Sequence, residues 1–103
     1  MNTVIVELAS FKVVDGTSDS DVRDAVLVLD GYLATRPGYI DRELHHDPAT
    51  GDWIEQMRWE SVEAAESARE PFFSSPHAQP LIAIIDQESA KMTLLESVIA
   101  RGE

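Results

Sequence analysis

The stretch that decides the fold is GYIDRELHHDPATGDWIEQMRWE, residues 38–60, in which two strand-like runs flank a turn. The runs are residues 39–46 and 53–59, and both contain the aromatic and apolar residues that suit a pleated surface. Between them, DPATGD places Pro48 and Gly51 for a type I turn followed by a left-handed residue. The pattern predicts a β-hairpin.

The turn also predicts which residues of the hairpin share a face. A loop of residues 48–51 pairs His46 with Trp53, and neighbouring strand residues point to opposite sides of a sheet. His45 and His46 are therefore separated and do not form one site. One face is predicted to carry Ile40, Arg42, Leu44, His46, Trp53, Glu55, Met57 and Trp59. The other is predicted to carry Tyr39, Asp41, Glu43, His45, Ile54, Gln56 and Arg58, with Asp41 facing Arg58.

Upstream of the hairpin, the sequence predicts a strand and then an amphipathic helix. Residues 3–14 are rich in β-branched side chains and run into the turn dipeptide Asp15-Gly16. A helix then follows, with Ser18 as N-cap, Asp21 completing a capping box, and Pro37-Gly38 ending it. Its apolar face comprises Val22, Ala25, Val26, Leu29, Tyr32 and Leu33.

Downstream of the hairpin, a second helix, a short third helix and a final strand are predicted. Ser61 caps the second helix, and Pro71 is expected to end its regular part. Proline suits a first helical turn, so the third helix is expected to begin near Pro80, and residues 90–99 read as a strand. The apolar stripe of the second helix is Val62, Ala65, Ala68 and Phe72.

The order of elements, β-α-β-β-α-(α)-β, is typical of an α+β, ferredoxin-like protomer with an antiparallel four-stranded sheet. Helices would cover one face of that sheet, yet the other face also holds apolar side chains that need burial. A second copy of the chain is the simplest cover, because twofold homodimers are the commonest assemblies. We therefore expect a homodimer.

Composition limits the possible partners. The 103 residues suit a single domain, 1–103, and the formal net charge of −11 disfavours nucleic acid and anionic membrane surfaces. There is no basic segment before the first apolar stretch and no run long enough to span a bilayer, so a soluble, cytoplasmic protein is expected. The absence of cysteine excludes disulfides, thiolate nucleophiles and iron–sulfur clusters.

The first hairpin face has the composition of a small-molecule pocket. Arg42 lies diagonal to Glu55 on an otherwise apolar surface, with Trp53 and Trp59 at its two ends. The alternative is a core face with one partly buried ion pair. His77, close in sequence to Phe72 and Phe73, could face the same cleft, or it could be an ordinary surface histidine.

Metal and nucleotide cofactors are not expected. Glu43 and His45 supply only two ligands on one strand face, and the sequence has no His-x-x-x-His or Glu-x-x-His motif. It also has no glycine-rich phosphate loop, no Gly-x-Gly-x-x-Gly and no Gly-x-Ser-x-Gly elbow.

Three segments carry a family resemblance: RPGYIDREL (36–44), DPATGDWIEQMRWES (47–61) and FFSSPHAQPL (72–81). Together with the order of elements, they resemble antibiotic biosynthesis monooxygenase-like domains of the dimeric α+β barrel superfamily. The resemblance covers nearly the whole chain. It implies a protomer whose sheet pairs with that of a second copy to form a barrel, with a pocket between the helices and the sheet of each subunit.

The resemblance also implies a chemistry. Some members oxygenate electron-rich aromatic compounds without metal or flavin, holding a phenol or quinol as its anion for direct reaction with dioxygen. Such a site needs a base, a hydrogen-bond donor and a dry pocket, and His46 and Arg42 would suit the first two roles. A related branch degrades heme with an Asn on the first strand, a Trp on the third and a His on the last helix. Residues 4–14 contain no Asn and His77 precedes the expected helix, so heme degradation is a minor alternative.

Two hypotheses follow. In the first, the chain is a cofactor-independent oxygenase or a related small-molecule enzyme, with a cavity of roughly 300 Å³ or more that holds His46 or His77. In the second, it is a noncatalytic dimeric binding or accessory domain, in which those polar groups are ion-paired and Trp and Phe side chains fill that space. The first hypothesis assigns catalysis to His46 and Arg42, and substrate binding to Trp59, Phe72, His77, Trp53 and Glu55.

Overall fold

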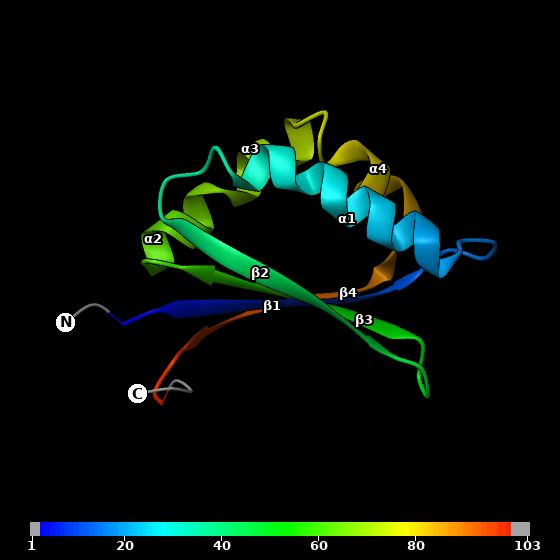
Figure 1. The fold of residues 1–103 in the computed structure, drawn as a ribbon, viewed down its shortest axis with the longest axis horizontal. Helices are drawn as coiled ribbons and strands as arrows, with labels where there is room; N and C mark the ends of the chain where they lie inside the picture. Colours follow the sequence, from blue (N-terminus) through cyan, green and yellow to red (C-terminus); the bar gives the residue numbers. More distant parts are fainter. Residues whose placement is uncertain (1–2, 100–103) are drawn as a thin grey trace.

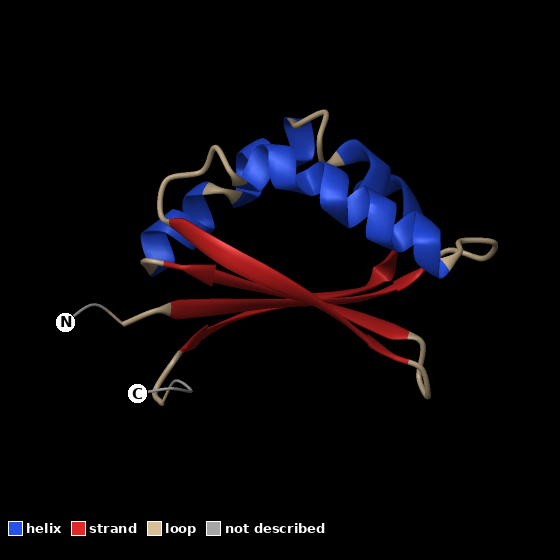
Figure 2. Cartoon of the chain, viewed as in Figure 1, coloured by secondary structure: helices blue, strands red, loops and turns tan. Residues whose placement is uncertain are grey.

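The computed structural model describes residues 3–99, which form one four-stranded antiparallel sheet with all its helices on one face (Figure 1). The strand order is β2-β3-β1-β4, and the view coloured by secondary structure separates the helical layer from the sheet (Figure 2). The elements are β1 (Ile5–Val13), α1 (Asp19–Leu33), β2 (Tyr39–Asp47), β3 (Asp52–Trp59), α2 (Val62–Ser67), α3 (Arg69–Ser74), α4 (Gln79–Ile84) and β4 (Ile85–Glu96). The predicted α+β, ferredoxin-like class is confirmed.

Helix α1 follows its sequence signals closely. The Ser18 hydroxyl accepts a hydrogen bond from the Asp21 backbone N–H at 3.1 Å, and the Asp21 carboxylate accepts one from the Ser18 N–H at 3.0 Å. These reciprocal bonds satisfy two backbone donors that a helix start otherwise leaves free. All the predicted apolar residues of this helix are buried: Val22, Ala25, Val26, Leu29, Tyr32 and Leu33.

The hairpin has the predicted register, from Asp47 opposite Asp52 to Asp41 opposite Arg58. One correction concerns its far end, where the register shifts and Tyr39, rather than Ile40, lies opposite Trp59. An extra residue in one strand reverses the faces beyond it. Tyr39 therefore packs edge-on against Trp59 with ring centroids 5.5 Å apart, whereas Ile40 is exposed.

The region after the hairpin differs from its prediction in two places. The second helix is divided at Ala68 into α2 and α3, and Pro71 lies in the first turn of α3 instead of ending a helix. Proline is tolerated there because the first backbone N–H groups of a helix need no partner within it. Helix α4 contains Pro80 in its first turn, as predicted, but β4 begins directly after it at Ile85 and not at residue 90.

The face of the hairpin that carries Arg42 and Glu55 lies under the helices. Trp53, Met57 and Trp59 alternate along β3 as buried residues and form one core with the apolar face of α1. None of the helices in residues 3–99 is long and apolar enough to cross a membrane.

Candidate active site

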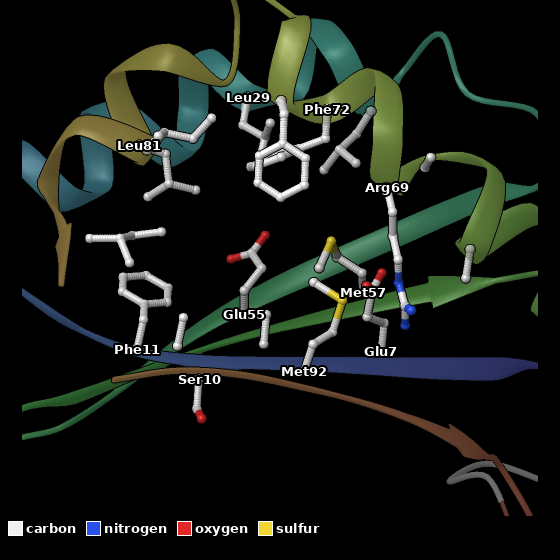
Figure 3. Close-up of a pocket in the computed structure, with 18 of the residues that line it drawn as sticks. Glu7, Ser10, Phe11, Leu29, Glu55, Met57, Arg69, Phe72, Leu81 and Met92 are labelled. Atoms are coloured by element: carbon white, nitrogen blue, oxygen red, sulfur yellow. The ribbon is translucent and has the colours of Figure 1, made fainter. Parts of the chain in front are cut away.

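A cavity of about 260 Å³ lies between the sheet and the helices, with its floor on β1, β3 and β4. Most of its lining is apolar, and the close-up shows Phe11, Leu29, Phe72 and Leu81 around one end (Figure 3). Across the sheet, the small Ala9 stands directly beside Glu55 and so leaves open space next to its side chain. Hereafter this space is called the cavity. At about 260 Å³ it is smaller than the roughly 300 Å³ or more expected from the sequence, and it has room for a small organic molecule.

Glu55 is the polar group at the centre of the cavity. It is 2% exposed, and its carboxylate rises from β3 toward Leu29, Phe72 and Leu81 (Figure 3). Neither of its oxygens has a hydrogen-bond partner within residues 3–99. Burial raises the pKa of Glu55 to about 7, against a smaller lowering by Arg42. A buried carboxylate with this pKa, and without a hydrogen bond to hold it ionised among the described residues, can both accept and return a proton near neutral pH.

A second buried carboxylate, Glu7 on β1, lines the same cavity. It accepts a hydrogen bond from the Trp59 indole N–H at 2.9 Å, so that donor is not free for a ligand. Burial raises the pKa of Glu7, while the Trp59 hydrogen bond and the nearby Arg69 guanidinium act to lower it. Arg69 descends from α3 beside Glu7 and is a cation bordering the cavity (Figure 3).

Arg42 stands behind Glu55 and does not line the cavity. Its Nε donates to Asp30 Oδ1 at 2.8 Å and lies 3.4 Å from Glu55 Oε1, while its Nη2 donates to the Val26 carbonyl at 3.3 Å. The guanidinium thus connects α1 to the back of Glu55, and the partly buried ion pair of the alternative interpretation is present at this place. The Asp41–Arg58 pair predicted for the opposite hairpin face is confirmed, with two hydrogen bonds of 2.7 Å that lower the pKa of Asp41.

A separate groove of about 370 Å³, here called the α1 groove, runs between α1 and the hairpin. There the His46 ring stacks on Trp53, with centroids 3.9 Å apart and planes within 13°. His46 itself is exposed. The α1 groove is lined by Asp19, Arg23, Val26, Leu27, Arg42, Leu44, His46 and Trp53.

The residues selected from the sequence are therefore divided between two places. Trp59, Phe72 and Glu55 line the cavity; Arg42, His46 and Trp53 line the α1 groove. His77 lines neither, since its ring lies against Gly31 of α1, where an added Cβ would come within 2.8 Å of it. No histidine among residues 3–99 lines the cavity, whereas the α1 groove, at about 370 Å³, has the expected size and contains His46. His46 is too close to the hairpin turn, and His77 lies between α3 and α4 on the α1 side.

Sequence reasoning missed Glu7 and Arg69. A signal for Glu7 was available in the first strand. Glu7 is two residues from Ile5 and from Ala9, so it lies on the same inward face as these residues and Phe11. No comparable signal existed for Arg69, since its direction depends on the break between α2 and α3 at Ala68. Within residues 3–99, no three His, Asp or Glu side chains are grouped so that they could hold a metal ion.

The sheet order, the helical layer on one face and the cavity between them define the class. They are the architecture of antibiotic biosynthesis monooxygenase-like proteins, and the resemblance predicted from the sequence is confirmed at the level of the fold. No family model matches the chain, and no curated protein matches its sequence.

Particular solved structures share this fold across nearly their whole length. SnoaB, a cofactor-independent oxygenase from Streptomyces nogalater, has a TM-score of 0.76 at 17% identity, over 98% of this chain and 99% of that one. A putative antibiotic biosynthesis monooxygenase from Bordetella bronchiseptica has a TM-score of 0.81 at 17% identity, over 94% and 99%. The heme-degrading protein Rv3592 from Mycobacterium tuberculosis has a TM-score of 0.69 at 16% identity, over 100% of both chains. At identities this low, the structural likeness establishes the shared fold alone.

Proposed function

We propose that this protein is a cofactor-independent monooxygenase that acts on an electron-rich phenol or quinol, with Glu55 as its general base. The observation that carries the proposal is the Glu55 carboxylate, which is buried in a largely apolar cavity without a hydrogen-bond partner. Burying a carboxylate without a hydrogen bond costs stability, and sites that do so are often functional. The cofactor-independent oxygenase SnoaB, which has the same fold, supports this reaction class.

In the proposed reaction, Glu55 takes the proton of a phenolic hydroxyl, and the resulting anion gives an electron to dioxygen. Recombination forms a C–O bond at a ring carbon that bears one hydrogen, and the proton from Glu55 completes a hydroperoxide. Glu55 then removes the hydrogen from that carbon while the O–O bond breaks, which leaves a carbonyl and a hydroxide that is protonated to water. One dioxygen thus supplies one carbonyl oxygen and one water oxygen, and no external reductant is needed.

The surroundings of Glu55 suit the anion formed in the first step. Arg69 borders the cavity and offers a positive charge, while the apolar walls keep water from competing for the reactive ring. The base assigned from the sequence, His46, faces the α1 groove, and the proposal therefore transfers its role to Glu55.

The proposal is tested by measuring oxygen uptake with a panel of phenols and hydroquinones in the presence of a metal chelator. We expect turnover of at least one compound, with one atom of ¹⁸O from ¹⁸O₂ in the product. Binding without oxygen uptake would instead support the noncatalytic binding domain. Loss of turnover in His46→Ala, with Glu55→Gln still active, would return the base to His46.

We also propose that two copies pair through the sheet face that the helices leave uncovered. Val6 and Leu95 lie opposite each other on that face, and Leu8 and Ile54 belong to it as well. These apolar side chains are only half-buried or exposed in a single chain, so pairing would remove them from water. Analytical ultracentrifugation at micromolar concentration should give the mass of a dimer, and Leu8→Lys should shift it toward the monomer. A wild-type monomer would contradict this proposal.

A further inference from the structure

Three elements meet behind Glu55, outside the cavity itself. Helix α1 contributes Asp30, strand β2 contributes Arg42, and strand β3 contributes Glu55. The side chains become more exposed from the inside outward: 3% for Glu55, 13% for Arg42 and 50% for Asp30. Arg42 is therefore a partly buried cation between a buried carboxylate and a solvated one.

The two carboxylates compete for one guanidinium, and Asp30 receives the shorter contacts. Arg42 Nε donates to Asp30 Oδ1 at 2.8 Å, and Arg42 Nη2 lies 2.8 Å from the same oxygen. The distance from Nε to Glu55 Oε1 is 3.4 Å, and that oxygen accepts no hydrogen bond within the described residues. A hydrogen bond between ionised groups is normally 2.7–2.9 Å long, so Arg42 is shared unequally.

Helix geometry explains the preference for Asp30. Arg42 Nη2 also donates to the Val26 carbonyl at 3.3 Å, and Val26 lies four residues before Asp30 on the same face of α1. The helix thus presents two acceptors in line with the guanidinium. Arg42 is drawn toward α1, and Glu55 keeps an adjacent positive charge without a donor on its oxygens.

We propose that Asp30 is a positioning residue that holds Arg42 on α1 and so keeps both oxygens of Glu55 available to a ligand in the cavity. The catalytic meaning of this arrangement rests on the proposed function, whereas the arrangement itself is a property of the free protein. Without Asp30, the guanidinium is expected to turn toward Glu55 and form a direct hydrogen bond. Glu55 would then stay ionised to lower pH and become a weaker base.

Other charges near Glu55 are unchanged by a substitution at Asp30. Glu7 lines the cavity from β1 and Arg69 from α3, while Lys91 of β4 lies opposite Ser10 at its edge. Near Arg42, Tyr39 lies on β2, and burial raises its pKa above the usual value of 10.0. Asp19, Arg23 and His46 line the α1 groove together with Arg42. None of these groups contacts Asp30 through a hydrogen bond or ion pair among the described residues. The charge of Asp30 itself raises the pKa of Glu55, so a lower Glu55 midpoint is expected in Asp30→Asn even without movement of Arg42, and the Arg42 signal is the readout that reports its position.

The experiment is a ¹³C NMR titration of the Glu55 carboxyl in the free wild-type protein, Asp30→Asn and Asp24→Asn. Asp24 is an exposed acidic residue on the same helix, so its substitution matches the change in net charge. We expect the Glu55 midpoint in Asp30→Asn to fall by about one pH unit, and in Asp24→Asn by much less. The Arg42 Nε–H signal should move with the Glu55 titration in Asp30→Asn more than in the wild type.

Equal midpoints in the two variants, or an Arg42 signal that behaves as in the wild type, would overturn the positioning role. If a substrate is found, the acidic limb of the kcat/KM profile should shift with the NMR midpoint. A shifted midpoint together with a changed Arg42 signal, but no turnover in any variant, would keep the positioning role and refute the proposed function. Turnover with unshifted midpoints would support the proposed function and refute the positioning role of Asp30.

Discussion

Glu55→Gln is expected to lower turnover of a phenolic substrate by about 10²–10⁴-fold, the usual contribution of a general base. The substitution keeps the size and shape of the side chain, so the cavity should still bind the substrate. It removes the ability to take a proton at the centre of the cavity, together with the charge that faces Arg42 behind it. Oxygen uptake under substrate saturation measures kcat, and fluorescence quenching of Trp59 at the cavity wall can report binding separately.

The pH dependence of wild-type kcat/KM should report the ionisation of Glu55. The ionised form of Glu55 is the base, so kcat/KM should rise tenfold per unit below the pKa of about 7 and level off above it. In Glu55→Gln the residual activity should lack this rise with pH.

Glu43→Gln is the matched control, because Glu43 is an exposed glutamate on β2 that points to the opposite side of the sheet. It should retain wild-type turnover and the wild-type pH profile. Full activity of Glu55→Gln, or an equal loss in both variants, would show that Glu55 is not the base.

The register of the hairpin could be predicted because the short turn that sets it directly joins the two paired strands in the sequence. A four-residue loop fixes the pairing of His46 with Trp53, and the alternation of strand residues then assigns every other side chain as far as Asp41. The bulge at Ile40 lies beyond that range, since it depends on how the chain returns from α1. Local signals therefore predicted the register near the turn and failed near the helix.

The candidate site could be predicted only in part, for a related reason. Glu55 lies opposite Ala9 of β1, and Ala9 lies opposite Met92 of β4, so the floor of the cavity combines three strands that are distant in sequence. No turn in the sequence sets those registers. Trp59, Glu55 and Phe72 were found because they belong to segments with strong local patterns. The role given to His46 assumed that all of this hairpin face borders one pocket, but β2 is the edge strand and His46 lines the α1 groove instead of the cavity.

The stability of the folded chain should depend on pH in a way that also reports Glu55, with no need for a substrate. Its pKa is about 7 in the folded protein and 4.5 without the protein environment, so folding favours the protonated form. The contribution of Glu55 to the free energy of unfolding should therefore be highest below pH 4.5, and it should fall by about 3 kcal/mol as the pH rises to 7. Glu7, whose pKa is also raised by burial, acts in the same direction.

Glu55→Gln should remove most of this fall, because a neutral amide in the same place carries no charge to desolvate. The variant should match the wild type near pH 4.5 and exceed it above pH 7, by up to about 3 kcal/mol. Urea unfolding at a fixed protein concentration, from pH 4.5 to 8, measures the difference, and Glu43→Gln should follow the wild-type curve. Asp41 and Asp52 have lowered pKa values and so titrate below this range. Parallel curves for the wild type and Glu55→Gln would mean that Glu55 ionises in the folded protein at little cost. The pKa of Glu55 would then lie near its ordinary value, and Glu55 could not be a base that gains and loses its proton near neutral pH.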